Sequence, residues 1–244
     1  MSESHSPRLA GPQPFPGRVA AQVALTAAGG VVVIAALRAV LPGNGPGTLG
    51  AILAWLLVCG AVAVLMRRGY PHDRIGGCNV VTLLRAALTC ALLMPLLAGH
   101  AAGWTVAAVA GVGLVLDGVD GHLARRSGLA SRFGARFDME TDAALALVLS
   151  LHVIAGTVAR AEILVLGLAR YAFVLAGAAL PWLQADLPNR RWRKVICVIQ
   201  IGALILSQLP WLSPDQATII AWLAALLLAG SFAADVGWLW RHRA

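Results

Sequence analysis

The chain has 244 residues, of which 59% are hydrophobic and 12% are charged, and its mean hydropathy is +0.78. Soluble domains carry about 25% charged residues, so this composition excludes an ordinary soluble protein and places most of the chain in lipid. The net charge is +8, but the basic residues lie between apolar segments. There they indicate membrane topology and contacts with anionic lipids, and no nucleic-acid partner is expected.

Eight apolar segments approach the roughly 20 residues that a membrane-spanning helix needs. Pro, Gly and charged residues separate them, as in PGNGPG and LPNRRWRK. The sequence therefore predicts an all-α membrane protein with about eight transmembrane helices, preceded by a disordered cytoplasmic N-terminus at residues 1–17. In chain order, the expected helices cover residues 18–41, 48–66, 79–99, 103–124, 139–158, 161–184, 195–210 and 216–240.

Arginine and lysine concentrate in every second connection between these helices. The basic connections are 67–78, 125–137 and 185–194, and both termini are also basic. Because cytoplasmic loops carry the excess of positive charge, eight helices with both termini in the cytoplasm fit this alternation. The four cysteines form no CxxC pair and lie mostly in apolar runs, which favours packing over a disulfide framework or a zinc site.

The acidic residues are concentrated in one stretch, since five of only 11 lie between positions 117 and 142. Asp117 and Asp120 are three residues apart at the end of the fourth predicted helix. Asp138 and Asp142 are four apart at the start of the fifth. On a helix both spacings put the two side chains on one face. The two helices are antiparallel neighbours, so we expect the four carboxylates to meet at one depth near the cytoplasmic interface.

Four converging carboxylates repel one another, and each charge is costly within a membrane helix. Divalent cations would relieve both penalties, and an all-oxygen ligand set favours Mg²⁺ or Mn²⁺ over zinc. Two such ions form a known device for phosphoryl transfer. Simple pairing of these aspartates with nearby arginines is the structural alternative. Four aspartates at helical spacing, with Gly118, Gly121 and Gly134 beside them to admit a phosphate, favour the metal site.

This stretch resembles the signature of the class I CDP-alcohol phosphatidyltransferase family, D-x2-D-G-x2-A-R-x8-G-x3-D-x3-D. Every fixed position is filled, by Asp117, Asp120, Gly121, Ala124, Arg125, Gly134, Asp138 and Asp142. The resemblance implies a six-helix transferase core at residues 71–244, with residues 18–70 forming two extra N-terminal helices. It also implies an integral enzyme of phospholipid biosynthesis in a bacterial inner membrane, with its site facing the cytoplasm, and suggests a homodimer.

The resemblance further implies roles for individual residues. Asp117, Asp120 and Asp138 would bind the metal ions, and Asp142 would be the general base that may also touch metal. Gly121, Ala124 and Arg125 would hold the CDP moiety, with Ser131 and Gly134 near the diphosphate. A second match, Asn79-x-x-Thr82-x-x-Arg85, resembles the start of the first core helix of the family. It would place Asn79, Thr82 and Arg85 on one stripe facing the nucleotide, although Asn79 and Thr82 could be ordinary residues of a helix start.

Three basic residues are candidates for the pocket of the acceptor alcohol. Arg170 falls near the middle of the sixth predicted helix, where an arginine usually faces a cavity or a partner such as Glu162 or Asp235. Arg193 and Lys194 belong to a basic cluster that also fits a topology signal. Family members that use glycerol phosphate often carry a GKxKT-like segment there. This chain has RRWRKVICVIQ instead, which puts glycerol phosphate in doubt as the acceptor without excluding it.

The sequence thus predicts transfer of a phosphatidyl group from CDP-diacylglycerol to an alcohol with release of CMP, dependent on Mg²⁺ or Mn²⁺. A CDP-choline- or CDP-ethanolamine-type enzyme, with the lipid as acceptor, would carry the same signature. A cation-binding transporter is a different class, but it would spread its acidic residues across the midplane. A scaffold with an inactive site would not need the complete set of aspartates.

Overall fold

A computed structural model describes residues 17–43, 45–100, 103–129, 131–156, 163–185, 187–188 and 191–242. The N-terminal segment that was predicted to be disordered lies outside these residues, apart from Gly17, which begins the first helix. The helices are α1 Gly17–Leu37, α2 Pro46–Gly69, α3 Gly76–Ala91, α4 Leu93–Leu97, α5 Trp104–Ser127, α6 Arg132–Gly156, α7 Leu164–Ala179, α8 Arg191–Leu206 and α9 Pro214–Arg241, with a 3-10 turn at Pro181–Gln184.

The all-α prediction is confirmed, since the described part of the chain contains no strand. Eight of its helices are at least 16 residues long. Among the described residues, five segments are long and apolar enough to cross a membrane: α1, α2, α3 together with α4, α5, and α9. Large apolar side chains are exposed along many of these helices, as expected for surfaces that face lipid.

The third predicted helix is interrupted where the sequence analysis expected a continuous span. α3 ends at Ala91 and the short α4 begins at Leu93. Pro95 explains the break, because proline lacks the N–H that would bond to the carbonyl of Ala91 four residues earlier. Leu92 sits at the junction, and its carbonyl oxygen lies 2.7 Å from Nε2 of the buried His152 on α6.

The connection predicted at 125–137 is much shorter in the structure. α5 continues to Ser127 and α6 begins at Arg132, so both helices extend into the expected loop. Gly128 ends α5 in the left-handed conformation (φ 64°), which glycine adopts without the steric cost of a Cβ. Ser131 precedes α6, and its Oγ accepts a hydrogen bond from Gly134 N (3.0 Å), as an N-cap residue does. This tight reversal brings the two ends of the signature together.

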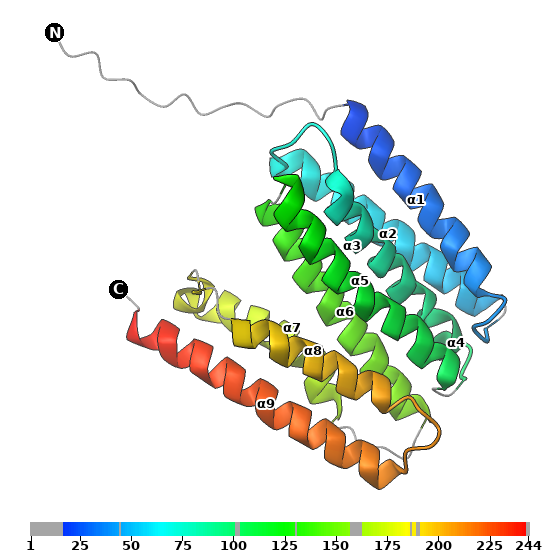
Figure 1. Cartoon of the computed structure of the whole chain (residues 1–244), viewed down its shortest axis with the longest axis vertical. Coiled ribbons are helices and arrows are strands. Elements are labelled where there is room, and N and C mark those ends of the chain that lie inside the picture. Colours follow the sequence, from blue (N-terminus) through cyan, green and yellow to red (C-terminus); the bar gives the residue numbers. More distant parts are fainter. Residues whose placement is uncertain are drawn as a thin grey trace.

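α3 is the central helix of the bundle. It packs against α5 and α6, and these two in turn pack against α8 (Figure 1). α1 and α2 cover α3 on one side, and α9 lies against α8 at the other edge. The end of α5 and the starts of α3, α6 and α8 converge, which determines where the signature residues meet.

Candidate metal and transfer site

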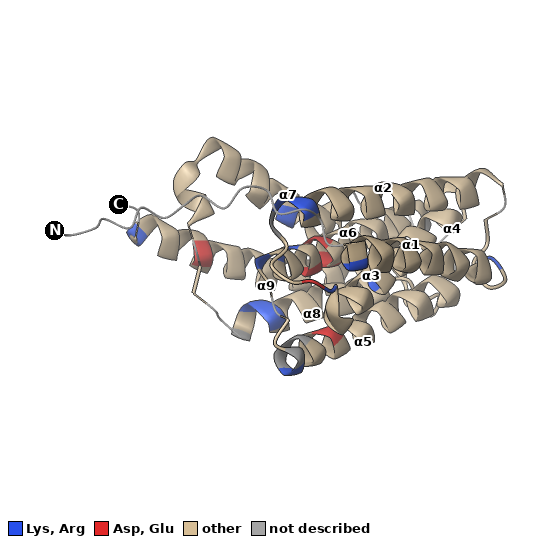
Figure 2. Cartoon of the chain, turned by 90° about the horizontal axis from the view of Figure 1, so that it is seen from above, with Lys and Arg blue, Asp and Glu red and all other residues tan. Residues whose placement is uncertain are grey.

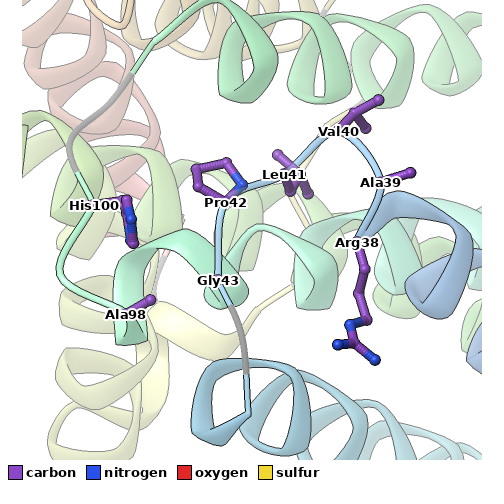
Figure 3. A pocket seen from close by; sticks show the side chains of 8 residues that line it. All are labelled: Arg38, Ala39, Val40, Leu41, Pro42, Gly43, Ala98 and His100. Carbon is purple, nitrogen blue, oxygen red and sulfur yellow. The ribbon is translucent and has the colours of Figure 1, made fainter.

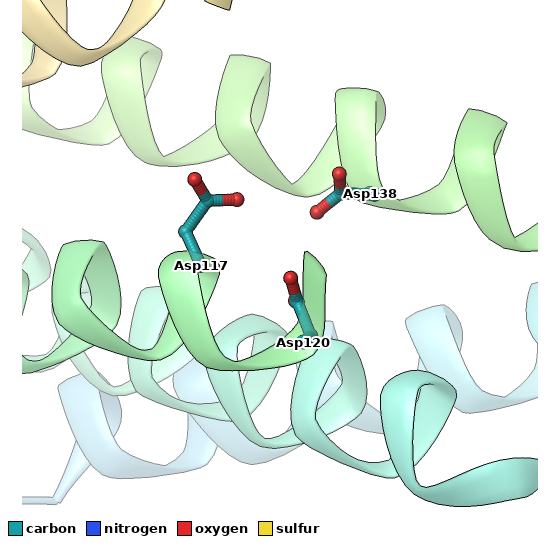
Figure 4. A group of neighbouring side chains, drawn as sticks. All are labelled: Asp117, Asp120 and Asp138. Atoms are coloured by element: carbon teal, nitrogen blue, oxygen red, sulfur yellow. The ribbon is translucent and has the colours of Figure 1, made fainter. Parts of the chain in front are cut away.

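Three of the predicted aspartates converge across the gap between α5 and α6. Asp117 and Asp120 extend from α5 toward Asp138 of α6 (Figure 4), and one oxygen of each lies within 4.8 Å of the others. Oxygens on opposite sides of a bound Mg²⁺ are about 4.2 Å apart, so a small contraction would bring this set into coordinating range. The donor set fits a hard divalent cation.

Arg85 occupies the centre of the cluster, whereas the second motif had predicted only that it faces the nucleotide. Its guanidinium is 2% exposed and pairs with Asp117 (3.0 Å), Asp120 (2.8 Å), Asp138 (2.5 Å) and, at shorter range, Asp142. The spacing of three between Asn79, Thr82 and Arg85 had indicated a shared helix face, but it could not show that this face points at the aspartates. Figure 2 shows acidic and basic segments next to each other beside α3 and α6.

The charges in this cluster do not balance. Four carboxylates surround a single guanidinium, which leaves three negative formal charges if all four are ionised. Asp120 is buried, whereas the side chains of Asp117 and Asp138 are 27% and 38% exposed, so the surplus is only partly hydrated. An arginine alone therefore cannot compensate the cluster, whereas one or two added divalent cations would.

Asp142 differs from the other aspartates. It lies outside the three-residue group that could hold one ion, but it shares the Arg85 guanidinium with them. Its second oxygen lies 3.8 Å from Sγ of Cys197 on α8, another site neighbour that the sequence did not reveal. Cys197 had been assigned to packing, because nothing in the sequence indicates which face of α8 meets α6. One oxygen of Asp142 therefore pairs with the Arg85 guanidinium, and the other lies against the Cys197 thiol.

In the second motif, Thr82 contacts the aspartates, as Arg85 does, but Asn79 does not. Thr82 Oγ1 lies 3.2 Å from Asp120 Oδ2 and 3.0 Å from the carbonyl of Cys78. Asn79 instead donates from Nδ2 to the hydroxyl of Tyr70 (2.9 Å) and to the carbonyl of Ile75 (2.7 Å). Its Oδ1 faces Gly134, where an added Cβ would come within 2.8 Å of that oxygen.

The remaining predicted nucleotide ligands belong to α5 and to the start of α6. Gly121 follows Asp120 on α5, Ser131 immediately precedes α6, and Gly134 lies in the first turn of α6. Ala124 and Arg125 belong to the last turns of α5, but their side chains lie outside the described part of the structure.

The candidate acceptor residues are in three different situations. Arg170 pairs with Glu140 (2.7 Å), which was not among its two expected partners. Glu162 lies outside the described residues, and Asp235 pairs with Arg193 (3.3 Å). Arg193 also donates to the carbonyl of Pro188.

Lys194 is exposed, and its ammonium interacts electrostatically with Asp117. Arg170 and Arg193, in contrast, are each paired with a carboxylate outside the four aspartates.

A separate cavity of about 620 Å³ lies away from the aspartates, between the α1–α2 connection and the end of α4 (Figure 3). Its lining contains two residues with ionisable side chains, Arg38 and His100, and no carboxylate. It therefore offers no carboxylate for a hard cation, and it shares no residue with the signature.

The comparison with protein families agrees with this geometry. The sequence model of the CDP-alcohol phosphatidyltransferase family matches residues 77–230, which is more than half of the chain. The chain belongs to the CDP-alcohol phosphatidyltransferase family. Comparisons with curated proteins and with solved structures give no match. Family membership and the apolar helices make this an integral membrane transferase that acts on CDP-alcohols.

Proposed function

We propose that this protein transfers a phosphatidyl group from CDP-diacylglycerol to the hydroxyl of a small alcohol and releases CMP, as a step of phospholipid biosynthesis. The observation that carries the proposal is the convergence of Asp117, Asp120 and Asp138 beside Asp142, with more negative charge than Arg85 can compensate. A diphosphate substrate brings further negative charge, so the site needs metal cations to accept it.

Asp117, Asp120 and Asp138 would hold two ions of Mg²⁺ or Mn²⁺, as the surplus charge favours, with Asp142 at the edge of the set. Bound there, the metal would neutralise the diphosphate oxygens and the leaving CMP. Arg85 fixes the carboxylates relative to one another, because one planar guanidinium contacts all four. Thr82 supports this arrangement through its contact with Asp120.

Asp142 is the proposed general base. It would accept the proton of the acceptor hydroxyl while that oxygen forms a bond to the lipid-side phosphorus and the bond from this phosphorus to CMP breaks. Its position outside the three-aspartate group supports this role, since an oxygen directed toward Cys197 is not committed to the metal set. A largely buried location keeps competing water away from the reacting hydroxyl.

The CDP moiety is assigned to the small and polar residues that border the aspartates. This set is Asn79, Thr82, Gly121, Ala124, Arg125, Ser131 and Gly134. The absence of a side chain at Gly134 lets Asn79 approach the first turn of α6. The amides of that turn can attract a phosphate, because the start of a helix carries partial positive charge.

Lys194 is our first candidate for the charge that receives an anionic acceptor. Arg170 and Arg193 would border the acceptor pocket in supporting positions, since each is already paired with a carboxylate. A Lys194→Met variant tests this assignment. If the natural acceptor is anionic, its KM should rise roughly tenfold, while the KM of an uncharged alcohol should not change.

The proposed setting is a bacterial inner membrane, with the aspartates facing the cytoplasm. The basic residues at the start of α8 and after α2 lie at the same end of the bundle as the aspartates, which supports this orientation. We further propose residues 18–70 as an N-terminal helix pair, residues 71–244 as the transferase core, and a homodimer as the assembly.

The test is an assay of CMP release by the purified protein with radiolabelled CDP-diacylglycerol, Mn²⁺ or Mg²⁺, and a panel of alcohols. The panel contains inositol phosphate, glycerol phosphate, serine and choline. A parallel reaction pairs CDP-choline or CDP-ethanolamine with diacylglycerol. The proposal requires metal-dependent CMP release in the first reaction, and activity only in the second would instead identify the lipid as the acceptor. Absence of CMP release in both would refute transfer by this site.

A further inference from the structure

The α1–α2 pair lies outside the region that the family model matches, yet it contacts the start of α3 directly. Gln22 of α1 accepts a hydrogen bond through Oε1 from Ile75 N (2.9 Å). Ile75 is the residue immediately before α3, and no side chain of its own segment caps that end. An extra helix thus supplies a polar contact at the base of the helix that carries Thr82 and Arg85.

The contact continues into a closed network of hydrogen bonds. The Tyr70 hydroxyl donates to the carbonyl of Ile75 (2.7 Å) and accepts from Asn79 Nδ2 (2.9 Å). Burial raises the pKa of Tyr70, so its hydroxyl keeps the proton that it donates. Asn79 Nδ2 also donates to the carbonyl of Ile75 (2.7 Å), which directs its Oδ1 to Gly134.

The same network touches α6 at a second point. The Tyr70 ring packs edge-on against Phe133, with ring centroids 5.9 Å apart. Phe133 and Gly134 belong to the first turn of α6, which precedes Asp138 by one further turn. Gln22 therefore lies at one end of a chain of contacts whose other end is the helix that carries two aspartates.

The helix pair is rigid enough to transmit such a constraint. Trp55 of α2 is fully buried and donates from Nε1 to the carbonyl of Ala27 on α1 (2.8 Å). Its indole packs against Gly30, where an added Cβ would lie 2.3 Å from the ring. Farther along the pair, Gly43 and Gly47 pack directly on the carbonyl of Met94 in α4. The α1–α2 pair is thus in contact with the core at two places, Ile75 and Met94.

We propose that Gln22 is a positioning residue of the transfer site. By holding Ile75 it fixes the α2–α3 connection, and this connection sets the position of α3 relative to α6. That position determines where Arg85 and Thr82 lie among the aspartates. The inference rests on the proposed function, because it assigns the extra helices a role in the same metal-dependent site.

The test compares Gln22→Leu, which removes the acceptor, with Gln22→Glu, which retains one. Gln216→Leu is the matched control, because Gln216 Oε1 also accepts from a backbone amide, Ser213 N (3.0 Å), at the start of α9. The first measurement is hydrogen exchange of residues 70–79 in the metal-free protein. The second is the Mn²⁺ concentration that gives half-maximal CMP release.

Gln22→Leu should raise both the exchange rate and the half-saturating Mn²⁺ concentration by about fivefold, the size expected for one lost hydrogen bond. Both Gln22→Glu and Gln216→Leu should keep the exchange rate and the half-saturating Mn²⁺ concentration of the unaltered protein. A lower maximal rate with unchanged half-saturation would reflect loss of folded protein and would overturn the proposal, as would faster exchange without a change in half-saturation. Absence of CMP release by the unaltered protein would instead count against the proposed function, and exchange would still test the network.

Discussion

The polar side chains in the two halves of α6 have different kinds of partner. In its first half, Asp138 and Asp142 both pair with one shared guanidinium. In its second half, Ser150 donates to the carbonyl of Ala146, and His152 lies against the carbonyl of Leu92. The polar side chains of the second half contact backbone carbonyls, whereas the first half keeps a surplus of negative charge. Unbalanced charge, and not polarity alone, distinguishes the candidate ligand site in the first half of α6 from the packing contacts in its second half.

The largest effect is expected from removing the proposed base. Asp142→Asn keeps the shape of the side chain but cannot accept a proton, so kcat should fall by about 10²- to 10⁴-fold. The half-saturating metal concentration should change much less than kcat, because Asp142 lies outside the three-aspartate group. Initial rates across a Mn²⁺ titration provide both values. A variant with undiminished kcat would assign Asp142 to packing, as for the polar residues in the second half of α6.

Arg85→Met tests the surplus of charge directly. Without the guanidinium, four carboxylates repel one another in a buried site, and the free energy of unfolding in the absence of metal should fall by about 3–5 kcal/mol. Added Mn²⁺ should recover more stability in this variant than in the unaltered protein. Thermal unfolding with and without Mn²⁺ measures the difference, and Arg85→Lys is the control that keeps one positive charge. Equal metal dependence in all three proteins would contradict the charge argument.

Gly134→Ala tests the close approach between α3 and the start of α6. The added Cβ would lie 2.8 Å from Asn79 Oδ1 and 3.3 Å from Ser131 Oγ, so one of these groups must move. We expect the KM for the CDP-linked lipid to rise about tenfold, the effect of a modest packing strain. Gly111→Ala on α5 is the control, because its Cβ would meet no atom within 4 Å. Similar KM values for both variants would remove Gly134 from the site.

The smallest effect on activity is expected from the second half of α6. His152→Leu would leave the carbonyl of Leu92 without its side-chain partner, at a cost of about 1–3 kcal/mol in unfolding free energy. The kcat of the folded protein should stay within about twofold of the unaltered value, since the transfer step makes no use of this residue. Denaturant unfolding and steady-state kinetics measure the two quantities. A fall in kcat as large as that of Asp142→Asn would end the distinction between the two halves.

Local patterns were sufficient for much of the fold and for the aspartates. Apolar segment lengths predicted all eight long helices, and the spacings of three and four predicted that Asp117, Asp120 and Asp138 converge. Helix boundaries were less accurate, because Pro95 interrupts the third span and the α5–α6 connection is closed by Gly128 and capped by Ser131. Such ends depend on turn and cap contacts more than on hydrophobicity.

The sequence by itself determined the class of protein, the family and the residues of the signature, because composition and short-range spacing carry that information. Only the tertiary structure decided how the helices face one another. It placed Arg85 among the aspartates, paired Arg170 with Glu140, and connected Gln22 to Ile75 across 53 positions of sequence. These contacts join residues on different helices, and helical periodicity defines a face without naming the face that it meets. The aspartates could be found from their spacing, but their counter-charge and its support could be found only from packing.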